Sequence, residues 1–291
     1  MNLLYMAFGP NAKIHLQTAF SIYSFLTQKQ FINSINIVTD NEAFYSHLSS
    51  QVYIINVTEN DLTEWKGEQQ FFWRIKIKAI ENVCLLYPNK PVVYLDCDTF
   101  LYGDLSVLNN SLLNHQAFMH EDEGVLSAKT TKTQKNMWRQ IAGKTFGNLP
   151  MQPTDHMWNA GVVGIPNRHN GADCKQALAI CDEMCRQGVS RYFIEQYSLS
   201  LALEKTYGLM EAKTAIGHYW STKELWTNRI HDFFIEAYFT GWSDETILNK
   251  MKDFDTSSIP IYQKVKTTNV RLKEWVDKMF ANRNLQYLPK K

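Results

Sequence analysis

The 291-residue chain lacks the features that mark several large classes of protein. It has only 13 Gly and 8 Pro, which excludes a collagen-like repeat and a long low-complexity linker. No apolar run approaches the ~20 residues that a membrane-spanning helix needs. The five Cys are an odd number without a Cys-x-x-Cys pair, so we expect reduced thiols rather than a disulfide framework.

The chain also lacks an excess of either charge, because its 30 Lys and Arg and its 29 Asp and Glu give a net charge of +1. This balance argues against a nucleic-acid partner, which would require a basic surface. Residues 1–8 carry neither a basic segment nor a small-residue cleavage site, so they predict a buried strand and not a signal peptide. A chain of this length with 45% hydrophobic residues can form a full core, and we expect a soluble, cytoplasmic protein.

In the first half of the sequence, strand patterns alternate with helix patterns. Apolar or β-branched runs predict strands at residues 3–8, 35–39, 51–57 and 91–95. Apolar residues at helical spacing predict helices at residues 15–27 and 71–86. This alternation predicts an α/β fold with a mainly parallel sheet that helices cover on both faces. In such sheets ligands bind at the carboxyl ends of strands, which is where Asp40 and Asp96 fall.

The second half is less regular and ends in a basic stretch. Its patterns predict a strand at residues 158–165 and helices at residues 173–187 and 191–204. Residues 264–291 combine eight Lys and Arg with the aromatic residues Trp275, Phe280 and Tyr287. This stretch predicts either contact with the inner face of an anionic membrane or an amphipathic helix packed on the domain, and we favour the packed helix.

The strongest chemical signal is an Asp-x-Asp motif behind an apolar strand. Residues 92–95 are apolar and place Asp96 and Asp98, one residue apart, at the end of the strand. Two like charges this close are costly to bury unless a cation neutralises them, and a hard divalent ion with oxygen ligands does so. A solvated turn is the non-functional alternative. Two chemistries use such a pair: hydrolysis through a phosphoaspartate, and transfer of a sugar from a nucleotide diphosphate.

Four segments, in order along the chain, resemble one enzyme family. Residues 94–108 (Tyr-Leu-Asp-Cys-Asp-Thr-Phe-Leu-Tyr-Gly-Asp-Leu-Ser-Val-Leu) resemble the segment around the Asp-x-Asp motif of GT-A glycosyltransferases. The similarity is greatest to the family-8 group, which includes lipopolysaccharide galactosyltransferases and glycogenin. Three further segments are similar to that group's first helix, its Asn-x-Gly-Val strand and its His-containing segment: residues 19–26, 158–163 and 216–226.

This resemblance implies a fold, a reaction and a metal site. The fold is a GT-A domain over residues 1–230, on which a basic, helical C-terminal extension, residues 231–291, is packed. The reaction is the transfer of a hexose-type sugar from a nucleotide-diphosphate donor, with uridine as the expected base, to a hydroxyl group of a glycan or another acceptor. Matched position by position, Asp96, Asp98 and His218 are the metal ligands, and this mixed set suits Mn²⁺ somewhat better than Mg²⁺.

The same resemblance assigns residues to the chemistry and to the donor. Lys223 places a cation on the departing diphosphate. Gln196 lies at the reacting face of the anomeric carbon, and Glu195 acts as a general base or only as a hydroxyl acceptor, so the stereochemical outcome stays open. Tyr197 stands where family members carry a second acid. The remaining substrate-binding predictions are Asn159 and Gly161 in the sugar pocket, Phe8, Asn11 and Asp40 at the nucleotide, and Trp220.

Several alternatives remain open at the level of sequence. One basic residue of the helix before the metal strand is expected to reach the donor; Arg74 and Lys78 are the first candidates and Lys76 is an alternative. The acidic cluster at residues 120–123 either binds acceptor hydroxyls or is a solvated strand exit. Two other functions also fit: a metal-dependent phosphatase or nucleotidyltransferase that uses the same carboxylates, and a nucleotide-sugar-binding module without turnover.

Overall fold

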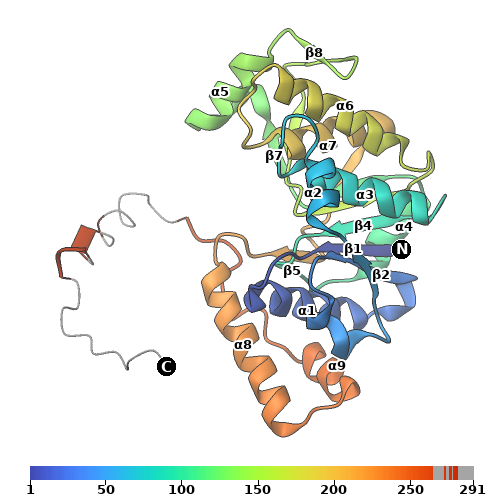
Figure 1. Ribbon diagram of the computed structural model, residues 1–291, viewed down its shortest axis with the longest axis vertical. Coiled ribbons are helices and arrows are strands. Elements are labelled where there is room, and N and C mark those ends of the chain that lie inside the picture. The colour runs from blue at the N-terminus through green and yellow to red at the C-terminus, as the bar shows by residue number, and fades with distance from the viewer. Residues whose placement is uncertain (265–271, 273–274, 277, 281–291) are drawn as a thin grey trace.

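A seven-stranded mixed sheet forms the centre of this computed structural model, which describes residues 1–264, 272, 275–276 and 278–280 (Figure 1). The strand order is β12-β6-β11-β4-β1-β2-β3. The strands are β1 (Asn2–Met6), β2 (Ser34–Thr39), β3 (Tyr53–Asn56), β4 (Val92–Leu95), β6 (Ala117–Met119), β11 (Val162–Ile165) and β12 (Leu209–Glu211). Strand β11 runs antiparallel to its two neighbours, and all the other pairs are parallel. The predicted α/β fold with a mainly parallel sheet is therefore confirmed.

The central strands form where the sequence is continuously apolar. Leu3, Leu4 and Tyr5 of β1 are fully buried, although neighbouring residues of a strand point to opposite faces of the sheet. Such a run is typical of a parallel strand that is covered on both sides. Strand β1 pairs with β4 so that Tyr5 lies opposite Leu95, and both strands therefore end at the same edge of the sheet. Asp96 follows at that edge.

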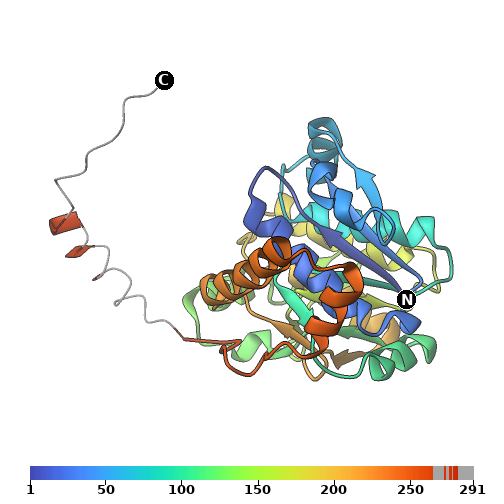
Figure 2. The same ribbon diagram turned by 90° about the horizontal axis from the view of Figure 1, so that it is seen from below.

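Helices cover both faces of the sheet, as Figures 1 and 2 show. Buried side chains of four helices form one apolar cluster on the first face: α1 (Ala12–Leu26), α4 (Leu105–Leu113), α8 (Lys223–Thr240) and α9 (Asp244–Lys252). Three helices form a second cluster on the other face: α3 (Arg74–Leu86), α6 (Ala172–Arg186) and α7 (Ile194–Tyr207). The shorter helices are α2 (Glu59–Lys66), α5 (Lys132–Ile141) and the 3-10 helices Lys29–Phe31, Glu42–Leu48 and Leu126–Ala128.

Two-stranded ribbons flank the main sheet: β5 (Thr99–Leu101) with β13 (Ile216–His218), β7 (Asp122–Val125) with β10 (His156–Trp158), and β8 (Thr145–Phe146) with β9 (Leu149–Pro150). The single strand predicted at residues 158–165 is wrong, because the chain leaves one sheet after Trp158 and enters another at Val162. Between them, Gly161 O accepts a hydrogen bond from Asp96 N at 2.8 Å, and Ala160 O accepts one from Lys76 Nζ at 3.1 Å. The break between the strands thus lies beside the Asp-x-Asp motif.

Helices α8 and α9 pack on α1 and share its apolar cluster. Trp226 of α8 is fully buried and stacks on Phe100 of β5, with ring centroids 4.5 Å apart. Its Nε1 donates to Pro260 O at 3.1 Å, so the segment after α9 returns to the start of α8. The predicted C-terminal helical extension is confirmed in α8 and α9, but the domain boundary placed at residue 230 falls inside α8.

Most of the predicted basic stretch, residues 264–291, lies outside the described residues. Those of its side chains that are described include Leu272, Trp275 and Phe280, and all three are exposed. Among the helices that the structure describes, none combines the length and the apolar composition needed to cross a membrane.

The packing of Trp226 provides a test of whether α8 belongs to the core. The Trp226→Ala variant should lose about 3–5 kcal/mol of unfolding free energy, because the change leaves a large cavity between α8 and β5. Tyr238 lies on the same helix and is 80% exposed, so Tyr238→Ala should cost less than about 0.5 kcal/mol. Urea unfolding measures both values. A loss of unfolding free energy in Trp226→Ala as small as that in Tyr238→Ala would contradict the described packing. A separate early unfolding transition of α8 and α9 would also contradict it.

Candidate active site

Two carboxylates stand at the end of β4, on the carboxyl edge of the sheet. The four residues of β4 are buried, and Thr99 closes the turn behind them by donating from its N and its Oγ1 to Asp96 O, at 3.2 and 2.8 Å. Asp98 is 4% exposed, whereas the Asp96 side chain is 27% exposed. Burial of acids one residue apart is unfavourable without positive charge nearby, so their neighbours decide what this site can do.

A pair of short strands brings His218 to these carboxylates from a distant part of the sequence. Strand β13 pairs with β5 so that His218 lies opposite Thr99. His218 Nε2 is 3.5 Å from Asp98 Oδ1 and 3.8 Å from Asp96 Oδ2. One ligand atom from each of these three side chains lies within 4.8 Å of the others. Two carboxylates and an imidazole at these separations could hold a divalent metal ion.

Asn159 and Gly161 hold the imidazole of His218 in this orientation. Asn159 Oδ1 lies 3.2 Å from His218 Nδ1 and can accept a hydrogen bond from it, so that Nε2 is the ring nitrogen that faces the carboxylates. A Cβ atom on Gly161 would lie 2.2 Å from His218 Cε1, so only glycine leaves room for the ring. Both residues were predicted to line a sugar pocket, and the structure places them against His218. The mixed donor set of two carboxylates and an imidazole fits a metal such as Mn²⁺ or Mg²⁺.

Two lysines neutralise the carboxylates from opposite sides. Lys223, the first residue of α8, places Nζ 3.0 Å from Asp98 Oδ2. Lys76 of α3 places Nζ 2.9 Å from Glu195 Oε1 and 3.4 Å from Asp96 Oδ1. The Lys76 side chain is 5% exposed and the Lys223 side chain is 56% exposed. The first lysine is therefore a fixed part of the interior, whereas the second is free to move into solvent.

The pKa shifts follow from burial and from these ion pairs. Burial raises the pKa of the Asp98 carboxyl, but the contacts with His218 and Lys223 outweigh it and hold that pKa well below its usual range. Burial lowers the pKa of Lys76, but the charges of Asp96 and Glu195 outweigh it and raise the pKa above its usual value. Burial raises the pKa of Glu195 despite the opposing effect of Lys76. Lys76 thus stays protonated inside the protein.

The three basic residues of α3 point to different partners. Arg74 Nε is 2.6 Å from Asp182 Oδ1 on α6, and Lys78 forms an ion pair with Glu81 of its own helix. Residues two apart on a helix lie on nearly opposite faces, so Lys76 points the other way, towards the carboxylates. Of the three, Lys76 is thus the one that contacts the carboxylates, whereas Arg74 and Lys78, the first candidates for the donor, bind acids elsewhere.

The beginning of α7 contributes Glu195 and Gln196, which were predicted to act on the sugar. Glu195 is held by Lys76, as described above. Gln196 Oε1 accepts a long hydrogen bond from Ala160 N at 3.5 Å. Its Nε2 is buried and has no hydrogen-bond partner among the described residues. Buried amide donors are normally satisfied, so this unpaired donor is an exception that a bound ligand would explain.

A cleft of about 260 Å³ opens in front of the carboxylates. Four of the predicted site residues line it, namely Phe8, Asp96, Asp98 and Lys223. Its other lining residues are Met6, Ile14, Gln17, Phe72, Trp73, Tyr94 and Cys97. Three of these were not among the predicted site residues: Phe72 and Trp73, which are about half exposed, and Tyr94, whose hydroxyl donates to Asp96 Oδ1 at 2.6 Å. Two adjacent aromatic residues directly before a helix were the available signal.

The predicted nucleotide contacts Asn11 and Asp40 have structural partners of their own. Asn11 Oδ1 accepts from Lys13 N at 3.1 Å and so caps α1. Asp40 Oδ1 accepts from Gly9 N at 2.8 Å and ties the loop after β1 to the end of β2. Trp220 is 54% exposed, and its ring centroid lies 5.7 Å from that of Tyr262.

The acidic cluster at residues 120–123 is divided among several partners. Glu121 pairs with Lys213 at 3.1 Å, and Asp122 pairs with His156 at 2.8 Å. Glu123 Oε1 accepts from Asn159 Nδ2 at 3.3 Å and so supports the residue that orients His218.

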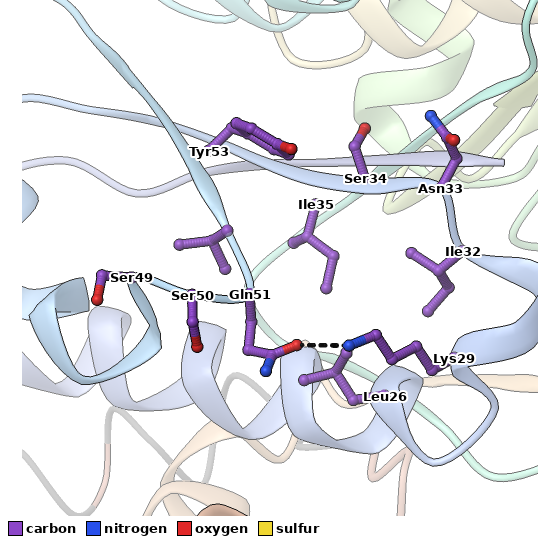
Figure 3. A pocket seen from close by; sticks show the side chains of 11 residues that line it. Leu26, Lys29, Ile32, Asn33, Ser34, Ile35, Ser49, Ser50, Gln51 and Tyr53 are labelled. Atoms are coloured by element: carbon purple, nitrogen blue, oxygen red, sulfur yellow. Dashed lines mark hydrogen bonds between the residues drawn. The ribbon is translucent and has the colours of Figure 1, made fainter.

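A separate cavity of about 290 Å³ lies at the amino ends of β2 and β3 (Figure 3). Lys29 Nζ donates there to Gln51 Oε1 at 3.0 Å, and Tyr53 stands at its rim. Because β2 and β4 both run parallel to β1, this cavity is at the opposite edge of the sheet from the carboxylates. It plays no part in the site described here.

Comparison with solved structures identifies the architecture. The galactosyltransferase LgtC, solved in complex with donor and acceptor sugar analogues, matches 96% of this chain and 100% of its own with a TM-score of 0.50 and 14% identity. The glycosyltransferase GlyE of Streptococcus pneumoniae matches 91% of this chain and 66% of its own with a TM-score of 0.52 and 14% identity. The chain has the GT-A fold. No family model and no curated protein sequence matches it.

The close contact between Gly161 and His218 provides a test of the site in this GT-A domain. Gly161→Ala should displace the imidazole and lower the affinity for Mn²⁺ by about 10- to 100-fold. Gly164→Ala is the matched control, because its Cβ would meet the Phe118 ring at 2.3 Å within the same sheet, away from His218. The control should destabilise the fold but leave Mn²⁺ binding intact. Calorimetric titration with MnCl₂ measures both, and unchanged affinity in Gly161→Ala would contradict the assignment.

Proposed function

We propose that the chain is a metal-dependent glycosyltransferase that moves a sugar from a nucleotide-diphosphate donor to a hydroxyl acceptor. The observation that carries this proposal is the meeting of Asp96, Asp98 and His218 with the ammonium group of Lys223 at the carboxyl edge of a GT-A sheet. A diphosphate leaving group is stabilised by a metal ion that chelates it and by a cation that neutralises its charge. The three metal-ligand candidates and the exposed ammonium group of Lys223 could supply both.

Asp96, Asp98 and His218 would hold the metal. Bound there, Mn²⁺ or Mg²⁺ would act as a Lewis acid on the diphosphate oxygens. The oxygen of Asp96 that does not face His218 accepts a hydrogen bond from Tyr94 and lies near Lys76. A carboxylate fixed in this way suits a metal ligand better than an attacking nucleophile, which argues against the phosphoaspartate alternative.

Lys223 would stabilise the negative charge that grows on the departing diphosphate. It occupies the first turn of α8, where the unpaired backbone N–H groups of the helix add positive potential. Its Nζ already lies at the cleft, 3.0 Å from Asp98. The charge would therefore be in place before the bond to the sugar breaks, which is how preorganised electrostatics lowers a barrier.

The transferred sugar would lie between the metal group and the start of α7. Lys76 fixes the carboxylate of Glu195, which can accept hydrogen bonds from sugar hydroxyls. Gln196 Nε2 offers an unused donor beside it. The apolar side of the cleft, with Phe8, Phe72 and Trp73, provides ring faces for the nucleotide base. Uridine as the base, and a hexose as the sugar, rest on the resemblance of the sequence. LgtC, a structural neighbour, binds donor and acceptor sugar analogues.

Loss of a metal ligand should abolish turnover. Asp98→Asn should lower the rate of UDP-sugar transfer or hydrolysis by about 100-fold or more, and EDTA should do the same to the unmodified protein until Mn²⁺ is restored. Asp104→Asn is the control, since Asp104 only caps α4 and asparagine can replace it there. Unchanged turnover in Asp98→Asn would contradict the proposed metal-dependent function. Tight nucleotide-sugar binding without product in any acceptor screen would favour the binding-module alternative.

Substitution of each basic residue of α3 should have a different effect on the kinetics of the donor sugar. Lys76→Gln should lower kcat/KM for the donor sugar by about 100-fold, measured below its reduced unfolding temperature, because Asp96 and Glu195 lose their counter-ion. Arg74→Gln should cost about 1–3 kcal/mol of stability with kcat/KM retained, and Lys78→Gln should change neither by much. A larger kinetic effect from Arg74→Gln or Lys78→Gln would contradict the placement of Lys76 at the donor.

A further inference from the structure

The two oxygens of Asp98 face different partners. Oδ1 lies 3.5 Å from His218 Nε2, on the side where the metal ligands converge. Oδ2 lies 3.0 Å from Lys223 Nζ. One oxygen of this carboxylate therefore faces the candidate metal site, and the other forms an ion pair with Lys223. An ion at the metal site and the ammonium group of Lys223 would share this carboxylate, and like charges that share a counter-ion oppose each other.

The formal charges of the site show how a metal ion and a diphosphate would each change its net charge. Three carboxylates, those of Asp96, Asp98 and Glu195, surround two ammonium groups, those of Lys76 and Lys223, and leave one negative charge. The imidazole of His218, which lies next to Asp96 and Asp98, would be neutral as a metal ligand. A divalent ion alone would turn the site positive. A sugar diphosphate, which carries two negative charges, would make it negative again.

Of the two lysines, only Lys223 can respond to the ligand. Lys76 is held by Glu195, Asp96 and the carbonyl of Ala160, and its side chain is 5% exposed. Lys223 has one acidic partner, is 56% exposed, and lines the cleft in front of Asp98. Its long side chain can leave Asp98 Oδ2 for an anion in the cleft without breaking any other ion pair that the structure describes.

We propose that Lys223 couples the binding of the metal to the binding of the diphosphate. Without a donor, Lys223 neutralises Asp98 and weakens the site for a metal ion alone. When a donor is bound, the Lys223 side chain moves to the diphosphate, and the Asp98 carboxylate then binds the metal without a competing cation. The metal and the diphosphate therefore bind as a pair, each raising the affinity for the other by the same factor. This inference rests on the proposed function and adds a second role for Lys223, which acts before any bond is broken.

The experiment is a binding cycle that needs no turnover. The dissociation constant of Mn²⁺ is measured by calorimetry or by the EPR signal of free Mn²⁺, with and without saturating UDP, in the unmodified protein and in Lys223→Gln. Lys223→Gln should bind Mn²⁺ alone about tenfold more tightly or better, because a positive charge has left the neighbourhood of the ion. UDP should raise its Mn²⁺ affinity about tenfold less than it does in the unmodified protein.

Two further variants make the result specific to this lysine. Lys205→Gln is the matched control, because Lys205 also pairs with a buried carboxylate, Asp155, at 3.4 Å, and its loss changes the net charge equally. It should leave both Mn²⁺ affinities unchanged. Lys223→Arg keeps the charge and should retain most of the coupling. Thermal unfolding of each variant confirms that the compared proteins are folded.

The outcomes separate this inference from the proposed function. If the unmodified protein binds no Mn²⁺ even with UDP, the proposed metal-assisted transferase function fails, and the coupling role fails with it. If it binds Mn²⁺ with UDP, but Lys223→Gln binds Mn²⁺ alone no more tightly, the function stands and the coupling role is overturned. Tighter Mn²⁺ binding in Lys223→Gln, together with slower sugar transfer, supports both.

Discussion

The balance between two lysines and three carboxylates is the interaction on which the rest of the site depends. Asp98 is almost completely buried, and Lys223 and His218 are the groups that make its charge tolerable there. On the other side, Lys76 joins Asp96 to Glu195. Because one oxygen of Asp96 and one of Asp98 each has a lysine partner, the other oxygen of each can face the imidazole of His218. The same contacts therefore stabilise the buried charges and leave a group of side chains that could hold a metal ion.

The GT-A fold makes this balance possible by joining rigid elements from different parts of the chain. Strand β4 delivers the acids, strand β13 delivers His218, and the first residue of α8 delivers Lys223. The break between β10 and β11 supplies Asn159 and Gly161, which orient the imidazole by a hydrogen bond and by the absence of a side chain. Sites built on packed strands and helix ends are held more precisely than sites on loops.

The sequence predicted the parts that local patterns encode. The apolar run of β4 followed by two acids was clear, and so was the α/β alternation, because both depend on neighbouring residues. The α3 cation that contacts the carboxylates was not clear, because Arg74, Lys76 and Lys78 are all basic and the choice depends on contacts with residues far away in sequence. His218 came from resemblance to a family, since no local pattern marks a histidine that meets its partners only through the pairing of β5 with β13. Asn11 and Asp40 form hydrogen bonds to the backbone that the sequence did not indicate, and their predicted contacts with the nucleotide stay predictions.

The most direct test is a crystal structure with Mn²⁺ and UDP, in which anomalous scattering locates the metal. The account predicts one strong anomalous peak bound by Asp96, Asp98 and His218 Nε2, with the diphosphate on its open side and Lys223 Nζ on a phosphate oxygen instead of Asp98 Oδ2. A metal bound elsewhere, or a nucleotide seated away from the carboxyl end of β4, would contradict it.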